Sequence, residues 1–252
     1  MQRREAKTGC KDARQRREAS RLYEEKRIKN KINTQGLTPF QKGRRDLLVF
    51  AKAPRLGQVK TRLINRLGEQ GAADLHQQLV KHCLQKFSNV FSTQLWCAPD
   101  ESHPFFQTCQ AEFGVSLHRQ MGSDLGERMA YALASSAPAV LIGSDCPSLT
   151  VETIDDAFAA LQHYPVVLAP AEDGGYVLIG LQQVIPELFI DIPWGSSQVL
   201  ALTLARLQDL KRPWKKLPTQ WDIDRPEDLE RWYETLKTEN GNKAIFEKHR
   251  FV

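Results

Sequence analysis

The chain has 252 residues, of which 41% are hydrophobic, 26% charged and 8% aromatic, a composition typical of a globular protein with a sizeable core. No apolar run reaches the ~20 residues that a membrane-spanning helix needs, and the first residues lack the apolar stretch of a secretory signal. The five cysteines are scattered without a Cys-x-x-Cys pair, which argues against a disulfide framework or a zinc knuckle. These features exclude membrane-spanning, collagen-like and disulfide-rich secreted proteins, and we expect a cytoplasmic protein.

Positive charge is concentrated in the N-terminal part of the chain. Residues 1–45 contain 15 lysines and arginines against five acidic residues, a net charge of +10, whereas the remaining residues carry a net charge of −5. Clustered cations bind phosphates, so a nucleic-acid-binding arm is one hypothesis. We favour a solvated extension, partly helical or disordered, because no aromatic residues or Cys/His motif are interleaved with the charges. Nucleic acid is therefore not an expected partner.

From residue 46 onward, short apolar runs alternate with longer amphipathic segments. Strands are expected at 47–51, 93–97, 115–118, 139–143, 166–169 and 176–179, and helices at 72–87, 104–113, 125–135, 151–162, 196–210 and 226–236. Apolar strands that alternate with helices are typical of parallel sheets covered on both faces. We therefore predict an α/β fold, a three-layer α/β/α sandwich with a mostly parallel, twisted sheet. Residues 46–238 would form this domain and residues 239–252 a C-terminal tail.

The first candidate site follows the first expected strand. Four cations lie in the eleven residues 52–62, which suits a loop that wraps around a polyphosphate. The segment is not a P-loop, because Val59 stands where that motif requires glycine. A surface loop with solvated charges is the alternative, but the position behind a buried strand favours phosphate binding. The candidate nucleotide and phosphate contacts in this loop are Lys52, Gly57, Lys60, Thr61 and Arg62.

The second candidate is Asp145, which follows the most apolar strand of the chain. A carboxylate at such a place needs a cation or hydrogen-bond donors. One carboxylate together with a nucleotide diphosphate is a usual way to hold Mg²⁺, so Asp145 is a candidate metal ligand. The alternative is that Asp145 stabilises the following turn or helix. The neighbouring Cys146 is expected to be a small buried residue and not a nucleophile.

The third candidate is the segment Asp173-Gly174-Gly175-Tyr176, between two apolar strands. Its glycines allow a ligand to approach the backbone closely, although the same residues suit a hairpin turn. With Asp145 at the end of a neighbouring strand, we prefer Asp173 as a second carboxylate over the same crevice. These residues and Trp194 are expected to form an acceptor and donor loop.

Two further pairs of residues could have either a structural role or a role in binding. Asp224 would cap the last helix, and Asp222 could reach a metal from the same face of an extended segment, although a structural role is favoured for this pair. Gly122 and Asp124 lie at another strand-to-helix turn and are candidate nucleotide contacts. Asp124 fits an N-cap at least as well, and we favour that interpretation for it.

Four motifs in the same order resemble a known family. Over residues 46–235, the chain is similar to the GT-A-type transferases found beside radical-SAM and selenium-related proteins, which are described as glycosyltransferases, some tied to arsenosugar biosynthesis. A more distant similarity is to guanylyltransferases with the nucleotide-diphospho-sugar transferase fold. The motifs that carry the resemblance are Phe50–Leu63, Gly143–Pro147, Asp173–Leu181 and Asp191–Ser197.

The resemblance implies a role for several of these side chains. Lys52, Lys60 and Arg62 would hold the nucleotide phosphates, and Asp145 would stand where relatives keep a metal-binding carboxylate. Asp173 would lie near the acceptor or the metal. Asp222 or Asp224 would correspond to an acidic residue that the related nucleotidyltransferases carry late in the chain.

These features predict a transferase that uses Mg²⁺ or Mn²⁺, a nucleotide-sugar donor and a small-molecule acceptor. Lys60 would neutralise the departing diphosphate, and Asp173 would orient or deprotonate the acceptor hydroxyl. The alternative enzyme is a nucleotidyltransferase, which attacks the α-phosphorus of a nucleoside triphosphate. The alternative of another class is a nucleic-acid-binding protein that uses the basic arm.

Overall fold

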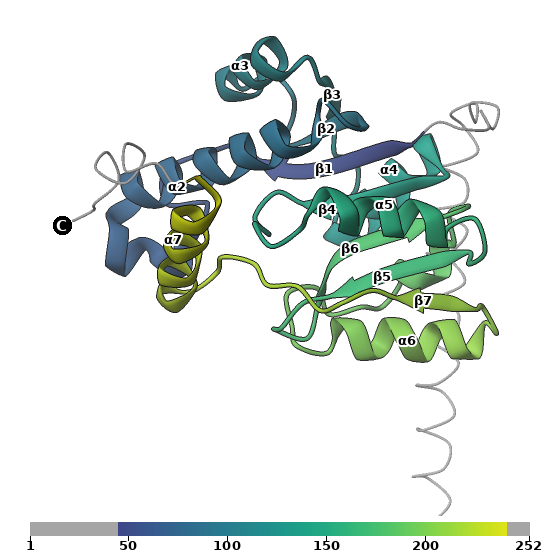
Figure 1. Cartoon of the computed structure of the whole chain (residues 1–252). Helices are drawn as coiled ribbons and strands as arrows, with labels where there is room; N and C mark the ends of the chain where they lie inside the picture. Colours follow the sequence, from purple (N-terminus) through teal and green to yellow (C-terminus); the bar gives the residue numbers. More distant parts are fainter. Residues whose placement is uncertain (1–44, 241–252) are drawn as a thin grey trace, which may run out of the picture.

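The computed structural model describes residues 45–240, so the interpretations made for residues 1–44 and 241–252 lie outside the described residues. The described part is an α/β domain built on a seven-stranded sheet with strand order β3-β2-β1-β4-β6-β5-β7 (Figure 1). The strands are β1 (Asp46–Lys52), β2 (Ser92–Ala98), β3 (Ser116–Arg119), β4 (Ala139–Gly143), β5 (Val166–Pro170), β6 (Tyr176–Leu181) and β7 (Trp214–Lys216).

Helices connect most of these strands, as the alternating apolar and amphipathic pattern predicted. The helices are η1 (Thr61–Leu63), α2 (Ile64–Phe87), α3 (Pro104–Phe113), α4 (Leu125–Ser136), α5 (Val151–Ala160), η2 (Pro186–Phe189), α6 (Val199–Asp209) and α7 (Pro226–Asn240). No helix of the described residues is long and apolar enough to cross a membrane.

The sheet is mostly parallel, which confirms the predicted fold class. Four neighbouring strand pairs are parallel, and β6 is antiparallel to both β4 and β5. The β5–β6 connection is therefore a hairpin, so the turn geometry considered for residues 171–175 is correct. Because β1, β4, β5 and β7 all run in the same direction, the segments that follow them emerge at a common edge of the sheet, which is called the carboxyl edge below.

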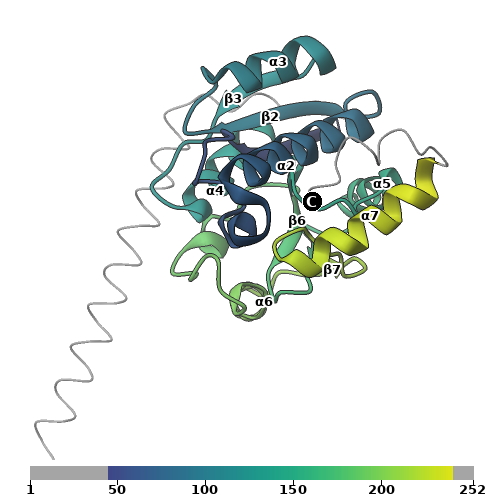
Figure 2. The ribbon, with the colours of Figure 1, turned by 90° about the vertical axis from the view of Figure 1, so that its left-hand side faces the viewer.

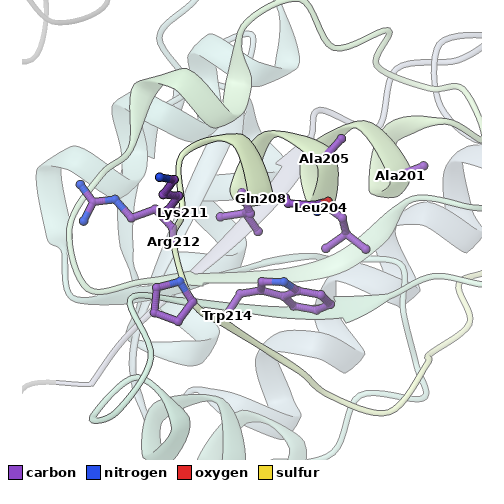
Figure 3. A pocket seen from close by; sticks show the side chains of 9 residues that line it. Ala201, Leu204, Ala205, Gln208, Lys211, Arg212 and Trp214 are labelled. Carbon is purple, nitrogen blue, oxygen red and sulfur yellow. The ribbon is translucent and has the colours of Figure 1, made fainter.

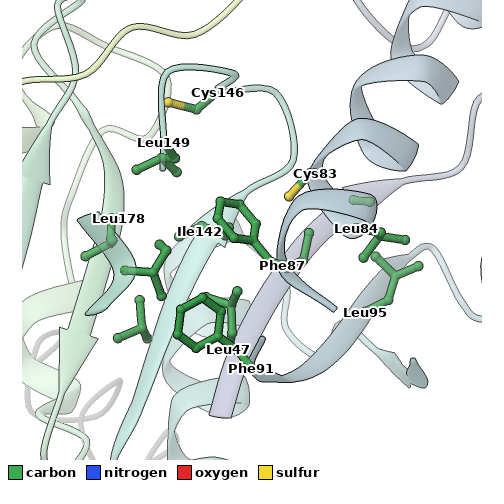
Figure 4. Close-up of a cluster of buried hydrophobic side chains, with 14 of the residues drawn as sticks. Leu47, Cys83, Leu84, Phe87, Phe91, Leu95, Ile142, Cys146, Leu149 and Leu178 are labelled. Atoms are coloured by element: carbon green, nitrogen blue, oxygen red, sulfur yellow. The ribbon is translucent and has the colours of Figure 1, made fainter. Parts of the chain in front are cut away.

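Side chains alternate between the two faces of the sheet, so helices bury both. Leu47 and Val49 of β1 pack with α2, α3 and α5, whereas Leu48 and Phe50 pack with α4, η2 and α6. Figure 4 shows part of the first cluster, in which Phe87 of α2 lies close to Ile142 of β4. The two helical layers and the sheet form the predicted three-layer sandwich.

A third, smaller cluster attaches the last helix to the first long one. Leu75 and Leu79 of α2 pack against Leu229 and Trp232 of α7, together with Ile223 from the segment before α7. Figures 1 and 2 both show α7 near α2. This contact fixes the segment 220–225 across the carboxyl edge.

Several element boundaries differ from the predictions. The helix expected from residue 72 begins at Ile64, with a kink at Gly68, where φ is 70°. The helix expected from Ser196 begins at Val199, and α7 continues past the expected domain end at residue 238. The short strand β7 was not predicted, because its sequence Trp-Lys-Lys has no apolar run.

Candidate functional site

Four loops at the carboxyl edge carry half of the sequence-predicted site residues. They follow β1 (residues 53–60), β4 (144–150), β5 (171–175) and β7 (217–225). In sheets of this kind, ligands bind at the carboxyl ends of the strands where the strand order reverses direction. Here the chain passes from β1 to β2 and β3 on one side and then returns to β4 on the other. The reversal therefore lies between β1 and β4.

Lys60 and Asp145 meet at that point. The Lys60 ammonium donates a hydrogen bond to Asp145 Oδ2 at 2.8 Å and a second one to the backbone carbonyl of Ile223. Lys60 has a left-handed backbone conformation, with φ at 47°, and its side chain is only 6% exposed. The loop thus turns the cation inward, toward the end of β4, although the two residues are 85 positions apart in the sequence.

Asp145 is held from several sides. Its backbone carbonyl accepts a hydrogen bond from Ile223 N at 3.0 Å, and a Cβ atom at Gly143 would lie 2.9 Å from its Oδ1. Burial opposes ionisation, but the charge and hydrogen bond of Lys60, together with smaller contributions from His76 and the backbone, lower the pKa of the Asp145 carboxyl. Asp145 is therefore an ionised carboxylate whose counter-ion is Lys60.

Asp222 is a second carboxylate close to this ion pair. Burial, followed by the negative charges of Asp145 and Asp173, raises the Asp222 pKa to about 6, and the Lys60 ammonium only partly compensates. The charges of Asp145, Asp173 and Lys60 thus all act on the Asp222 carboxyl. Clusters of strongly perturbed acids are common at functional sites.

Arg62 of η1 and Asp224 of the segment before α7 form a further ion pair. The expectation that Asp224 caps the last helix was wrong, because its carboxylate binds Arg62. The carboxylate at the start of α7 belongs to Asp228, whose Oδ2 accepts hydrogen bonds from the backbone N–H groups of Asp224 and Arg225. The partner of the Asp224 carboxylate is Arg62, which is far away in the sequence, so residue spacing around Asp224 does not reveal the contact.

The remaining residues of the first loop lie along the same edge. Lys52 is exposed at the end of β1, Thr61 is the first residue of η1, and Gly57 has a positive φ of 70°. His76, which the sequence analysis did not single out, is buried on α2, and its Nε2 lies 2.8 Å from the Lys52 carbonyl oxygen. Burial lowers the His76 pKa, so the neutral ring supports the loop without adding charge.

The β5–β6 hairpin packs against the loop before α6. Asp173 Oδ1 accepts a hydrogen bond from Gly175 N at 2.9 Å, and Gly174 has a φ of 91°. A Cβ atom at Gly174 would lie 2.3 Å from the carbonyl oxygen of Ser197. Glycine is therefore required here by close packing between two loops, in addition to any approach of a ligand.

Two aromatic residues of this region face each other. The rings of Tyr176 and Trp194 are 6.4 Å apart and nearly perpendicular. Burial raises the Tyr176 pKa, so its hydroxyl stays protonated. Both rings pack against the core beneath α4 and α6, and their assignment to an acceptor and donor loop stays a prediction.

Gly122 and Asp124 lie in the loop between β3 and α4. The Asp124 carboxylate accepts a hydrogen bond from Glu127 N at 2.8 Å, which confirms it as the N-cap of α4. Gly122 has a φ of 148°, and a Cβ atom there would lie 2.6 Å from Glu127 Cβ. In the part of the chain that the structure describes, no hydrogen bond or ion pair links this loop to Lys60 or Asp145. Its role as a nucleotide contact stays a prediction.

Cys146 is a structural residue, as expected. It is buried, its Sγ donates to the Trp221 carbonyl oxygen at 3.1 Å, and burial raises its pKa to about 12. A thiol that is protonated at neutral pH is a poor nucleophile. Cys146 therefore anchors the segment before Asp222.

The chain is similar to several proteins of known structure. It is 32% identical to a candidate nucleotide-diphospho-sugar transferase from Desulfovibrio desulfuricans G20, with a TM-score of 0.71 over 78% of this chain and 89% of that one. This chain belongs to the family of that protein. Residues 79–196 of this chain also match a protein family described as "Uncharacterized protein conserved in bacteria (DUF2064)". No curated protein matches the chain significantly.

More distant solved structures share the fold alone. A nucleotidyl transferase from Methanothermobacter is 14% identical, with a TM-score of 0.54 over 78% of this chain and all of that one. A 4-diphosphocytidyl-2C-methyl-D-erythritol synthase from Anaerococcus prevotii is 12% identical, with a TM-score of 0.53 over 77% of this chain and 96% of that one. These matches confirm a nucleotide-diphospho-sugar transferase-like fold.

The donor set at the carboxyl edge is compatible with a divalent cation of the Mg²⁺ type. Among residues 45–240, no group of three or more His, Cys, Asp and Glu side chains is arranged to hold a metal ion. Mg²⁺, however, is commonly bound by one or two carboxylates, with waters and phosphate oxygens completing its shell. The mutually repelling carboxylates of Asp145 and Asp222 are such a pair, so their chemistry fits a cation that arrives with a nucleotide.

Proposed function

We propose that this chain is a divalent-metal-dependent transferase that uses a nucleotide-activated sugar as donor and a small molecule as acceptor. The observation that carries the proposal is the contact between Lys60 and Asp145. It brings a cationic loop and a central acidic residue together at the strand-order reversal, where this class of sheet binds ligands. Membership in the family of the Desulfovibrio protein supports the same conclusion.

The cationic loop would bind the diphosphate of the donor. Lys60, Arg62 and Lys52 would face its oxygens, while Gly57 and Thr61 would shape the turn around them. As the bond between the sugar C1 and the diphosphate oxygen breaks, negative charge grows on the leaving group. Fixed cations aimed at developing charge are commonly the largest contribution to catalysis.

Asp145 and Asp222 would hold the Mg²⁺ or Mn²⁺ ion, which would supply further positive charge to the same diphosphate. Asp173 would accept the proton of the acceptor hydroxyl or orient that hydroxyl toward C1. The exposed position of Asp173 on the β5–β6 hairpin leaves it accessible to an acceptor from solvent. Gly174, Gly175, Tyr176 and Trp194 would line this side, and Gly122 and Asp124 would contact the nucleoside.

A ligand-screened thermal shift tests this proposal. The wild-type chain is expected to be stabilised by one class of UDP-, GDP-, ADP- or dTDP-sugar, and more strongly with Mn²⁺ present, because a ligand that binds the folded state raises its stability. Asp145→Asn should abolish the metal-dependent part and reduce NDP release at least about a hundredfold. Asp155→Asn is the matched control, because Asp155 is an exposed acid on α5 that pairs with Arg45. Full turnover in Asp145→Asn would refute the assignment.

Nucleotidyl transfer is the second candidate, and the position of Asp222 favours it. The resemblance to nucleotidyltransferases implies a late acid near the central one, and the charge of Asp145 indeed acts on Asp222. The reaction would place the same cations against a triphosphate, with attack at the α-phosphorus. Release of pyrophosphate from a nucleoside triphosphate, without NDP release from any nucleotide sugar, would select this function.

A further inference from the structure

A strongly basic segment lies outside the candidate site. Lys211, Arg212, Lys215 and Lys216 are exposed and flank Pro213 and Trp214 within six consecutive residues. None of these four cations forms an ion pair with a carboxylate of residues 45–240. No acidic residue occurs between Asp209 and Asp222, although residues 46–252 as a whole are net negative. The segment is therefore a local positive patch on an acidic domain.

The neighbouring helix α6 presents an apolar outer face. Ala201, Leu202 and Ala205 are exposed, and Leu202 retains 37% of its surface. A surface helix normally turns polar residues to solvent, with its apolar stripe toward the core. The buried side of α6 is formed by Val199, Thr203 and Leu207. Helix α6 therefore has apolar residues on its exposed side in addition to those on its buried side.

A groove of about 830 Å³ lies between this helix and the basic segment (Figure 3). Leu204 and Ala205 form its helical wall, and the Trp214 indole forms the opposite wall. Lys211 and Arg212 stand at one end, as Figure 3 shows. The groove thus combines an apolar floor with cations at its rim.

This surface is remote from the carboxyl edge. β7 is the last strand of the sheet order and runs parallel to β5, so residues 211–213 precede its amino end. The segment that carries Asp222 follows its carboxyl end. Lys211 and Arg212 therefore lie at the edge of the sheet opposite Lys60 and Asp145, and they are not part of the proposed transferase site.

We propose that this groove binds an acidic segment of another polypeptide, with an apolar side chain of that segment inserted between Trp214 and α6. A carboxylate beside the anchor would pair with Lys211 and Arg212 at the end of the groove, and a second one with Lys216, which shares the face of β7 that carries Trp214. Charge complementarity of this kind steers association and sets specificity, while a buried apolar anchor gives affinity.

Other occupants match the surface less well. Residues 1–45 of the chain carry a net charge of +10 and would be repelled. A second copy that used the same face around a two-fold axis would bring two positive patches together. A lipid surface calls for protruding apolar side chains, whereas Trp214 is partly buried and packs against the core.

Binding can be measured by fluorescence anisotropy with the full chain and a fluorescein-labelled peptide of glutamate, leucine and phenylalanine. We expect binding that weakens with salt, and an affinity that falls at least about tenfold when Lys211→Glu and Arg212→Glu are combined. The matched control combines Arg66→Glu with Arg119→Glu, two exposed cations of α2 and β3, which changes the net charge equally and should leave binding intact.

Ala205→Arg separates groove insertion from general charge attraction. This substitution adds a positive charge but places a long side chain over the groove, so we expect it to weaken peptide binding. Unchanged or tighter binding to Ala205→Arg would overturn the proposal, as would absence of peptide binding. The proposal also fails if phosphatidylserine vesicles or a single-stranded oligonucleotide bind this patch more tightly than the peptide. Circular dichroism of each variant checks that it is folded.

Discussion

The ion pair between Lys60 and Asp145 joins two loops that are far apart in the sequence. Removing either partner leaves the other charge partly buried without its counter-ion, which is costly. We expect a double-mutant cycle of Lys60→Met and Asp145→Asn to give a coupling energy of about 1–3 kcal/mol in the free energy of unfolding. Urea denaturation of the four proteins provides the measurement.

The ion pair between Arg62 and Asp224 is the internal control for that cycle. Arg62 lies two residues after Lys60 and pairs with the segment before α7, but the Arg62 side chain is 61% exposed, whereas that of Lys60 is 6% exposed. Exposed pairs contribute little, so a cycle of Arg62→Met and Asp224→Asn should give less than about 1 kcal/mol. Equal coupling energies in the two cycles would show that burial of Lys60 is not what stabilises the contact.

Asp222 should make the stability of the ligand-free protein depend on pH. Its folded-state pKa is raised to about 6, above the ordinary value of 3.8, so the folded state holds its proton more tightly than the unfolded state. Stability therefore falls as the pH rises through this interval. Asp222→Asn should remove that loss and be more stable than wild type by about 1–2 kcal/mol at pH 7.

Thermal unfolding at pH 4 and pH 7 in the presence of EDTA measures this difference. The variant and the wild type should differ little at the lower pH, where Asp222 is mostly protonated in the folded state. Added Mn²⁺ should stabilise the wild type more than the variant at the higher pH, because the ion favours the ionised carboxylate. A stability difference that is independent of pH would contradict the role given to the Asp222 charge.

At the level of elements, the β5–β6 hairpin is fixed by its contact with the loop before α6. Gly174→Ala combines a positive φ of 91° with a Cβ only 2.3 Å from Ser197 O, so we expect a loss of at least about 2 kcal/mol in the free energy of unfolding. Gly195→Ala is the control, because its φ is 84° but no atom lies within 4 Å of the added Cβ. The control should cost about 1 kcal/mol. Similar losses in both variants would exclude the packing contact as the cause.

Elements with a strong local signal could be predicted from the sequence. The apolar run of β4 and the start of α3 were placed at the correct residues, and Thr150 and Asp124 are the predicted N-caps. The strand β7 could not be predicted in this way. Its backbone is ordered by pairing with β5, at the sheet edge, and its basic side chains carry no periodic apolar pattern.

Several residues of the candidate site could be predicted from the sequence, but the ion pairs between them could not. Lys60 and Asp145 were correctly predicted to lie at one edge of the sheet, because each follows a strand and parallel strands end at the same edge. The choice of Asp224 as a cap was wrong, and the pairing of Arg62 with it depends on how α7 packs across the sheet. The perturbed pKa of Asp222 has the same origin, since burial and two distant carboxylates cause it. Such long-range contacts leave no signal in residue spacing.

At the scale of the whole molecule, the packing of α7 on α2 holds the segment that completes the site. Trp232 of α7 is 4% exposed and belongs to the same cluster as Ile223, whose carbonyl binds Lys60 and whose N–H donates to the Asp145 carbonyl. We expect Trp232→Ala to cost about 3–5 kcal/mol in the free energy of unfolding. It should also loosen the site locally, and faster hydrogen exchange at the Ile223 amide reports that effect.

Phe106→Ala separates this local effect from a general loss of stability. Phe106 of α3 is fully buried in the cluster on the α2, α3 and α5 face, so its truncation should cost a similar free energy. None of residues 220–225 belongs to that cluster, so under native conditions the Ile223 amide should exchange at nearly the wild-type rate. Equal acceleration in both variants would mean that the amide opens only by global unfolding. A selective effect of Trp232→Ala would show that α7 holds Lys60 and Asp145 in place through Ile223, which binds both of them.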